Sequence, residues 1–343
     1  MEVKENRMSL NERCKALLDD IGLTGPADKI VVTPLTGGVS SDIARVDLAD
    51  RSVCVKFALP KLKVAADWFA PVNRNKAEYA WLDTAAKIRP EGSIALLGRS
   101  EDLSGFAMEF LDGDSIYLWK DRLLNGVIAP GEARAVGDLM GAVHAVSATQ
   151  GFDRSPFDNT ADFHALRTEP YLVHTAGIHP DLADRLGAMA HTIDAADRVL
   201  VHGDVSPKNI FFRDQSAIVL DAECATMGDA SFDSAFCIHH LVLKSVFRPA
   251  DAGPILKGIG DYWSAYRSRI DWEDPVALEA RTAALVPALM LARIDGKSPV
   301  EYLSEDQRAL VRKLARGLIF QPPPNLDDLA LKVATELKVH TRV

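Results

Sequence analysis

The chain has 343 residues, of which 48% are hydrophobic and 25% are charged, and its formal net charge is −9. This length exceeds that of one small domain, so we expect two lobes or domains. The composition is that of an ordinary globular protein, and the negative charge, without any basic stripe, argues against a general nucleic-acid binder.

Three further features favour a cytoplasmic protein with no membrane partner. The N-terminus is charged from its second residue, unlike a signal peptide. The four cysteines are scattered, show no Cys-x-x-Cys spacing and are expected to be reduced thiols in the core. The best apolar run, residues 284–292, is shorter than a membrane span and predicts a buried helix.

The first third of the chain is predicted to be rich in β-structure. An amphipathic helix at residues 9–21 comes first, and a second helix at residues 73–88 separates the third strand from the fourth. The strand segments are short, contain many β-branched residues and are bounded by turn residues, which is typical of antiparallel strands. They are residues 29–35, 41–49, 52–59, 93–100 and 105–113.

From Pro130 the pattern is mostly helical, with clear helices at residues 131–148, 180–196 and 231–246. A strand–loop–strand unit and one further strand interrupt the helices between residues 199 and 221. We therefore predict an α+β fold with two lobes. The β-rich N-terminal lobe covers residues 1–111, and the helical C-terminal lobe covers residues 112–343.

The strand–loop–strand unit "VLVHGDVSPKNIFF" places a carboxylate, Asp204, and an amide, Asn209, in one polar loop. If the next two strands form a hairpin, Asp221 emerges at the same end of this small sheet as Asp204. Carboxylate and amide oxygens are hard ligands that suit Mg²⁺ better than zinc. Glu223, two residues beyond Asp221, could add a further oxygen.

A second group of residues is suited to bind phosphate. The turn "LTGGVSSD" offers backbone N–H groups at Gly37 and Gly38 and the hydroxyl groups of Ser40 and Ser41. Lys56 lies inside an apolar strand and needs a charged partner, because an unpaired buried ammonium is unfavourable. Glu78, on the following helix, is the obvious candidate, and a Lys–Glu pair beside a glycine-rich hairpin positions the α- and β-phosphates in kinases.

Together these motifs resemble the protein-kinase-like small-molecule kinases, the superfamily of aminoglycoside phosphotransferases, choline kinases and methylthioribose kinases. "HGDVSPKN" is similar to the family's catalytic loop, "VLDAE" to its metal motif, "LTGGVSSD" to its nucleotide loop and "VCVKF" to its strand lysine. The resemblance covers about residues 30–245 in the correct order, and five weak or moderate motifs in order are a strong signal.

The resemblance implies a role for each residue of the catalytic loop and the metal motif. Asp204 would be the catalytic base that accepts the proton of the acceptor hydroxyl. Asn209 and Asp221 would hold Mg²⁺, with help from Glu223. His202 and Asp233 would support the loop without taking part in the chemistry; the sequence His202-Gly203 stands where protein kinases have His-Arg, so a protein substrate is not expected.

The resemblance also implies how the N-terminal lobe would bind ATP. Lys56, oriented by Glu78, would contact the α- and β-phosphates, and Ser40 and Ser41 would lie over the phosphates with Gly37 and Gly38. The strand end that contains Glu109 and Leu111 would border the adenine through its backbone.

Several alternatives were weighed. The loop around Asp204 could be an ordinary capped turn, and Glu78 a solvated helix residue. A serine hydrolase at "GVSSD" fails because the second glycine of a nucleophile elbow is absent. A Walker loop ending in Gly296-Lys297-Ser298 fails because Leu291 stands where a glycine is required.

We therefore expect an ATP- and Mg²⁺-dependent phosphotransferase that acts on a hydroxyl of a small molecule such as a sugar or amino alcohol. An aminoglycoside kinase and a nucleotide-binding pseudokinase scaffold are the alternatives. No nucleic acid or membrane is expected as a partner, and a homodimer stays open. Arg293, Asp295 and Lys297 are open candidates for contact with the acceptor.

Overall fold

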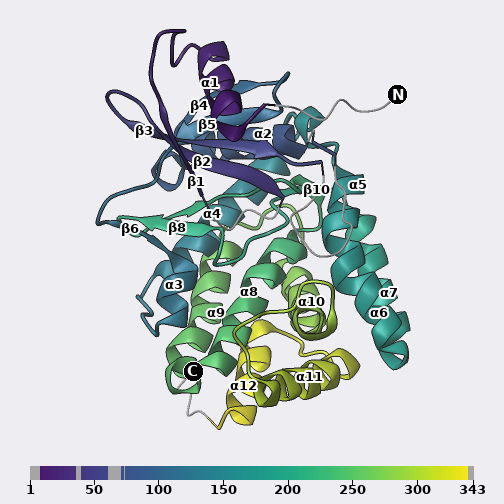
Figure 1. Cartoon of the computed structure of the whole chain (residues 1–343). Coiled ribbons are helices and arrows are strands. Elements are labelled where there is room, and N and C mark those ends of the chain that lie inside the picture. The colour runs from purple at the N-terminus through teal and green to yellow at the C-terminus, as the bar shows by residue number, and fades with distance from the viewer. Residues whose placement is uncertain (1–7, 36–39, 61–70, 73, 339–343) are drawn as a thin grey trace.

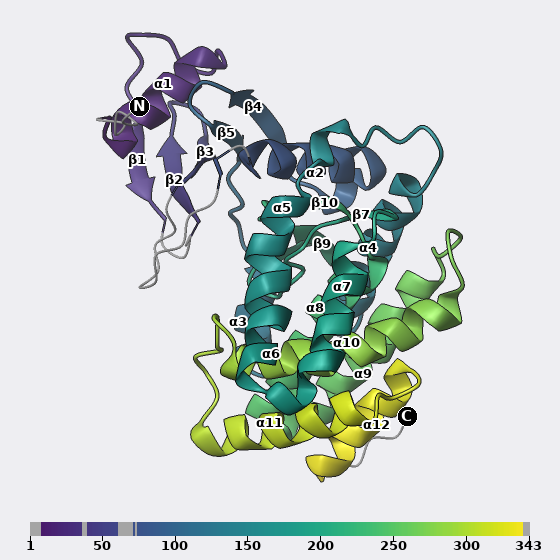
Figure 2. The same cartoon turned by 90° about the vertical axis from the view of Figure 1, so that its right-hand side faces the viewer.

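The computed structural model describes residues 8–35, 40–60, 71–72 and 74–338. An antiparallel sheet forms one end of the molecule and helices form the other (Figures 1 and 2). The sheet has five strands in the order β1-β2-β3-β5-β4. They are β1 (Val31–Pro34), β2 (Ser41–Asp47), β3 (Ser52–Ala58), β4 (Leu96–Ser100) and β5 (Gly105–Glu109).

Two helices accompany this sheet. The first, α1 (Leu10–Asp20), begins with a capping box in which Ser9 and Glu12 satisfy each other's backbone N–H groups. Its buried face, including Leu17, packs with sheet residues such as Val55 and Phe57 in a small separate core. The second, α2 (Arg74–Ile88), follows β3 and directs Glu78 toward Lys56. The expected order of three strands, a helix and two strands is what the structure has.

Two smaller sheets carry the loop that is predicted to be catalytic. The strands β6 (Ile116–Leu118), β8 (Ile210–Arg213) and β9 (Ser216–Val219) form one, and β7 (Val199–Val201) pairs with β10 (Thr226–Gly228) in the other. The hairpin expected between the two carboxylates is the antiparallel pair β8–β9. The lobe boundary at residue 111 stays a prediction; it lies in the segment between β5 and β6.

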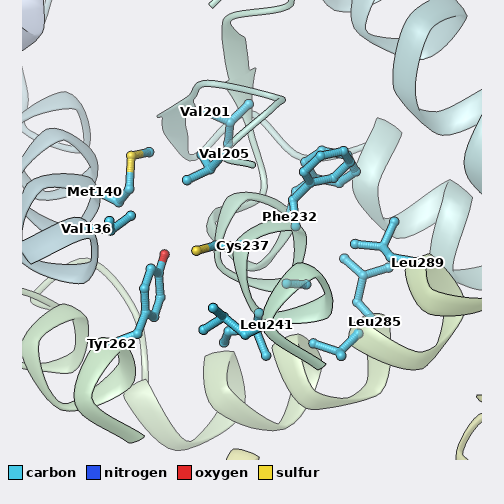
Figure 3. Close-up of a cluster of buried hydrophobic side chains, with 14 of the residues drawn as sticks. Val136, Met140, Val201, Val205, Phe232, Cys237, Leu241, Tyr262, Leu285 and Leu289 are labelled. Carbon is cyan, nitrogen blue, oxygen red and sulfur yellow. The ribbon is translucent and has the colours of Figure 1, made fainter. Parts of the chain in front are cut away.

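The centre of the helical part is α8 (Ala230–Phe247), in which every residue from Ala230 to Val246 is buried. Figure 3 shows α8 side chains such as Phe232 and Leu241 surrounded by residues of α4, α9 and α10. Because α8 is mainly apolar and buried on all sides, other helices pack around it. Those helices are α3 (Trp119–Leu124), α4 (Glu132–Ser147), α9 (Ala252–Arg267), α10 (Pro275–Asp295) and α11 (Glu305–Phe320), and α12 (Leu326–Glu336) packs outside them on α9 and α10.

A helical arm on one side of α8 was not expected from the sequence. It contains α5 (Thr160–Phe163), a π-helical segment (His164–Val173) and α6 (His174–Ile178), and it packs against α7 (Ala183–Asp194). Pro170 lies inside the π-helical segment, where its missing N–H would interrupt an α-helix. Short 3₁₀ turns complete the chain at Pro90–Gly92, Ser155–Phe157, Pro180–Leu182 and Pro249–Asp251.

The apolar run around residues 284–292 belongs to a longer helix than expected. α10 has 21 residues and is long and apolar enough to cross a membrane. Most of its apolar window, 61%, is nevertheless buried inside the structure, where α10 packs against α8 and α11. We interpret α10 as a core helix.

Candidate active site

The loop after β7 is held by a carboxylate at the start of α8. The backbone N–H groups of His202 and Gly203 donate to the two oxygens of Asp233 at 2.7 and 2.8 Å. Asp233 is fully buried and also contacts Nε2 of His144 at 3.2 Å. Gly203 has a φ of +84°, and a Cβ there would lie 3.0 Å from Cβ of Cys224, so this turn requires glycine.

His202 faces the protein interior. Its Nδ1 accepts a hydrogen bond from the backbone N–H of Asp204 at 3.1 Å, and its ring packs edge-on against Trp81. Burial lowers the pKa of His202, although the nearby carboxylates of Asp233 and Asp204 oppose the shift. A neutral ring that accepts at Nδ1 supports the loop conformation and is not placed as a proton donor to substrate.

Asp204 lies in this loop between two cations. Its Oδ2 is 3.1 Å from Nη2 of Arg167 and 3.2 Å from Nζ of Lys208. Burial alone would raise the pKa of Asp204, but Lys208 and Arg167 outweigh it and hold the pKa well below the ordinary value. The other oxygen, Oδ1, is buried without a hydrogen-bond partner among the described residues. An orphan acceptor of this kind indicates that a donor is supplied by a ligand or water.

Lys56 joins three elements in one buried ionic cluster. Its Nζ contacts Oε1 of Glu78 on α2 at 2.7 Å and Oδ1 of Asp221 after β9 at 2.5 Å. Burial disfavours the ammonium, but Asp221 and Glu78 together raise the pKa of Lys56, which stays charged. Burial raises the pKa of Glu78 to about 7, against the attraction of Lys56. The structure thus brings together three residues separated by up to 165 positions in sequence.

Asp221 and Asn209 are positioned by the hairpin between them. Leu220 N–H donates to the carbonyl of Asn209 at 2.9 Å, which places Asp221 beside the loop end. Asp221 has a φ of +71°, a left-handed conformation that is uncommon for a non-glycine residue and is concentrated at functional sites. Nδ2 of Asn209 donates to the carbonyl of Asp204 at 3.1 Å, so its Oδ1 remains the acceptor.

Glu223 is paired with a cation that the sequence did not single out. Its Oε2 accepts from Nε of Arg74 at 2.9 Å, and the Arg74 side chain is completely buried. Nη2 of Arg74 also donates to the carbonyls of Ser40 and Leu59, at 2.6 and 2.7 Å. Arg74 therefore ties the metal motif to the start of β2. The carboxylate of Glu223 is engaged with this arginine, whereas its predicted role was metal binding.

The remaining predicted nucleotide residues lie around β2, β3 and β5. Ser40 and Ser41 are buried at the start of β2, while Gly37 and Gly38 lie outside the described residues. Glu109 ends β5, where its side chain pairs with Arg213 at 2.6 Å. Leu111 lies two residues further on and is partly buried against the main core.

The three candidates for acceptor contact have different surroundings. Asp295 is bound by Arg312 at 2.6 Å and by His179 at 2.9 Å. Lys297 pairs with Glu169 at 2.7 Å. Arg293 instead lines a pocket together with Lys208, the residue that contacts Asp204.

The residues present suit a magnesium ion. Among the described residues, no group of three or more His, Cys, Asp or Glu side chains forms a metal-binding cluster. Mg²⁺ does not require one, since it is commonly held by one or two carboxylates, substrate phosphates and water. The partly exposed carboxylate of Asp221 and the Oδ1 of Asn209 offer the oxygen ligands that such an ion prefers.

Sequence reasoning missed Arg167, Arg74 and the contact of Lys208 with Asp204. Arg167 lies in the π-helical segment, 37 residues before Asp204. The sequence around Arg167 shows no helical periodicity and no motif that would identify it as a site residue. Lys208 had a signal, because it lies four residues after Asp204 and the loop turns back between them.

The fold is that of the protein-kinase-like proteins. A putative aminoglycoside phosphotransferase from Ralstonia eutropha superposes with a TM-score of 0.51 at 17% identity, covering 92% of this chain and 94% of that one. The ethanolamine kinase of Plasmodium vivax gives 0.53 at 11% identity, covering 98% and 91%. These likenesses confirm the predicted fold class.

Sequence comparison identifies the family. The model described as the phosphotransferase enzyme family matches residues 31–273, so this chain belongs to that family. The methylthioribose kinase of Pectobacterium atrosepticum is 24% identical over 276 residues, which are 68% of this chain and 68% of that protein. The methylthioribose kinase of Erwinia tasmaniensis is 25% identical over 225 residues, 57% and 55% of the two chains. The expected enzyme class, a phosphotransferase, is confirmed.

Proposed function

We propose that this protein transfers the γ-phosphoryl group of ATP, with Mg²⁺, to a hydroxyl of a small molecule. The observation that carries the proposal is the buried cluster in which Lys56 contacts both Glu78 and Asp221. This cluster connects β3, α2 and the segment after β9, as the binding of phosphates and metal in a kinase requires.

The transfer needs positioning more than covalent chemistry. Lys56 would bind the α- and β-phosphates, and its two carboxylate partners keep it charged. Asn209 and Asp221 would hold Mg²⁺, which when bound neutralises charge on the phosphates. Arg74 would keep the start of β2 in place over the site.

In the proposed step, the acceptor hydroxyl donates its hydrogen bond to Asp204 and passes its proton there as the new O–P bond forms. The bond between the γ-phosphorus and the bridging oxygen breaks, and ADP leaves. Because Lys208 and Arg167 hold the pKa of Asp204 low, this carboxylate is ionised before each turnover. It therefore acts mainly by orienting the hydroxyl, with proton transfer late in a loose transition state.

The relatives support a small alcohol as acceptor. Their names include a kinase of methylthioribose, a sugar derivative, and one of ethanolamine, an amino alcohol. An intact Lys56, Asp204, Asn209 and Asp221 disfavour the pseudokinase scaffold. The cytoplasmic location and the homodimer remain predictions.

The test is ADP release by the full chain with MgATP across a panel of sugars, amino alcohols, hydroxy acids and aminoglycosides. Stimulation by at least one alcohol that disappears in Asp221→Ala supports the proposal. Binding of MgATP without transfer to any member of a broad panel would favour the scaffold instead.

A further inference from the structure

A pocket beside the catalytic loop is lined mainly by cations. It has a volume of about 30 Å³ and lies where α3, the loop, α8 and the end of α10 with the segment after it meet. Four of its eight lining residues are Lys or Arg, and one is Glu. The lining residues are Lys120, Pro207, Lys208, His240, Lys244, Arg293, Glu301 and Tyr302.

Two of these cations have their charge balanced by a carboxylate. Lys120 pairs with Glu301 at 3.1 Å, and Lys208 pairs with Asp204 at 3.2 Å. The second pair also places the pocket in direct contact with the proposed catalytic residue. A molecule in this pocket would therefore lie one side chain away from Asp204.

The other two cations, Lys244 and Arg293, form no ion pair with a carboxylate among the described residues; their contacts are with an aromatic ring and with hydroxyl groups. Lys244 is 2% exposed, and its ammonium lies 5.2 Å above the ring of Tyr302. Nη1 of Arg293 donates to the hydroxyls of Ser298 and Tyr171, which are neutral, and its Nε is buried without a partner among the described residues. The imidazole of His240 is also buried in the pocket wall, with an unpartnered Nδ1 in that same part of the chain.

Contacts within the fold stabilise only one of these two cations, Lys244. Lys244 lies in the last turn of α8, where the helix dipole favours a cation, and its contact with Tyr302 is favourable. Neither effect provides a counter-charge for Arg293 in the same pocket. Lys244 is buried and Arg293 is partly exposed, and the single carboxylate of the pocket, Glu301, is paired with Lys120. Two neighbouring cations that share no carboxylate of their own favour the binding of an anion between them.

We propose that this pocket binds an anionic group of the acceptor, so that the substrate is a small alcohol carrying a carboxylate or a phosphate. This inference rests on the proposed function, because only a kinase would make the bound molecule a phosphoryl acceptor. Lys244 and Arg293 would bind the anion, and the hydroxyl would extend past Lys208 toward Asp204. A polycationic aminoglycoside or a choline-like alcohol would meet like charge in this pocket.

The test measures binding separately from turnover. Thermal shift and calorimetry on the full chain without nucleotide would use glycerate, glycerol 3-phosphate, glycerol and choline as probes. Carboxylate and phosphate probes are kept as separate arms, since either anion could fit. We expect at least one of the two anions to raise the Tm and the neutral and cationic probes to leave it unchanged.

The variants Lys244→Met and Arg293→Gln should weaken anion binding at least about tenfold, the loss expected for one charge-assisted hydrogen bond. Lys313→Met is the matched control, because Lys313 is an exposed lysine on α11, and it should bind the anion like the wild type. Lys244→Met should also raise the Tm of the free protein, which separates loss of binding from loss of folding. Anion binding that survives both variants, or equal binding of all four probes, would overturn the proposal.

Turnover distinguishes this inference from the proposed function. ADP release with choline or glycerol but with no anionic alcohol would overturn the anion pocket and leave the kinase in place. Anion binding that is lost in Lys244→Met, without ADP release from any alcohol, would keep the pocket and contradict the kinase.

Discussion

At the scale of single residues, Asp204 is the group on which the proposed chemistry depends. Asp204→Asn keeps the size of the side chain but removes the charge that orients the hydroxyl. We expect kcat to fall by roughly 10²–10⁴, the range for loss of a general base. Asp261→Asn, which alters an exposed helix carboxylate, is the control. Wild-type kcat in Asp204→Asn would remove Asp204 from the mechanism.

Lys244 gives the site a pH dependence that can be measured. Burial, with Lys120 and Arg293 nearby, lowers the pKa of Lys244 to about 7, while Glu301 and Cys237 oppose the shift. Of the other groups that face it, Lys208 is paired with Asp204 and the pKa of His240 is well below its ordinary value. Lys244 is therefore protonated below about pH 7 and loses its charge above it.

Two results follow from this titration. The KM of an anionic acceptor should be constant below pH 7 and rise above it, and Lys244→Met should abolish that rise. Because the unfolded chain binds the proton more tightly than the folded one, the wild type should also gain stability as pH increases from about 7 toward the ordinary lysine value of 10.5. An acceptor KM that is flat from pH 6 to 9 in the wild type would contradict the assignment.

At the scale of elements, the turn after β7 depends on one glycine. In Gly203→Ala the added Cβ meets Cys224 in a backbone conformation with positive φ. We expect the protein to lose about 1–3 kcal/mol of unfolding free energy. Gly187→Ala is the matched control, since Gly187 lies inside α7 with open space around it, and this variant should gain about 0.5–1 kcal/mol. Urea denaturation of both variants checks the difference, and equal stability of the two would contradict the strained turn.

Glu223, in the segment after β9, has a structural role. The structure pairs Glu223 with the buried Arg74. Glu223→Gln should therefore lower the free energy of unfolding by roughly 1–3 kcal/mol, because it weakens a charged hydrogen bond in the interior. The Mg²⁺ concentration at half-maximal activity should change little. A large increase in that concentration with unchanged stability would show instead that Glu223 is a metal ligand, as its motif predicted.

At the scale of the whole molecule, the sequence predicted what local patterns determine. The order of strands and helices up to β5 was predicted from the hydrophobic periodicity and the turn residues. The hairpin β8–β9 was predicted from the polar residues that flank its strands. The pairing of Lys56 with Glu78 was predicted because a buried lysine requires a charged partner and the following helix offers Glu78. The contact of Lys56 with Asp221, by contrast, was not predicted, although both residues were predicted to belong to the site.

What could not be predicted depends on contacts between distant segments. The partners of Arg167 and Arg74 lie 37 and 149 residues away, and neither arginine has a local pattern that marks it as buried. The cationic pocket is assembled from four separate segments, whose charged side chains meet only in the folded protein. The overall negative charge of the chain gave no indication of a cationic pocket.

The measurement that tests the central claim most directly is acceptor-stimulated ADP release by the wild type and by Asp204→Asn, at saturating MgATP. The account predicts that a small alcohol stimulates ADP release in the wild type and that Asp204→Asn loses roughly 10²–10⁴ of this rate. A panel of neutral, anionic and cationic alcohols that stimulates neither protein, or stimulates both equally, would contradict it.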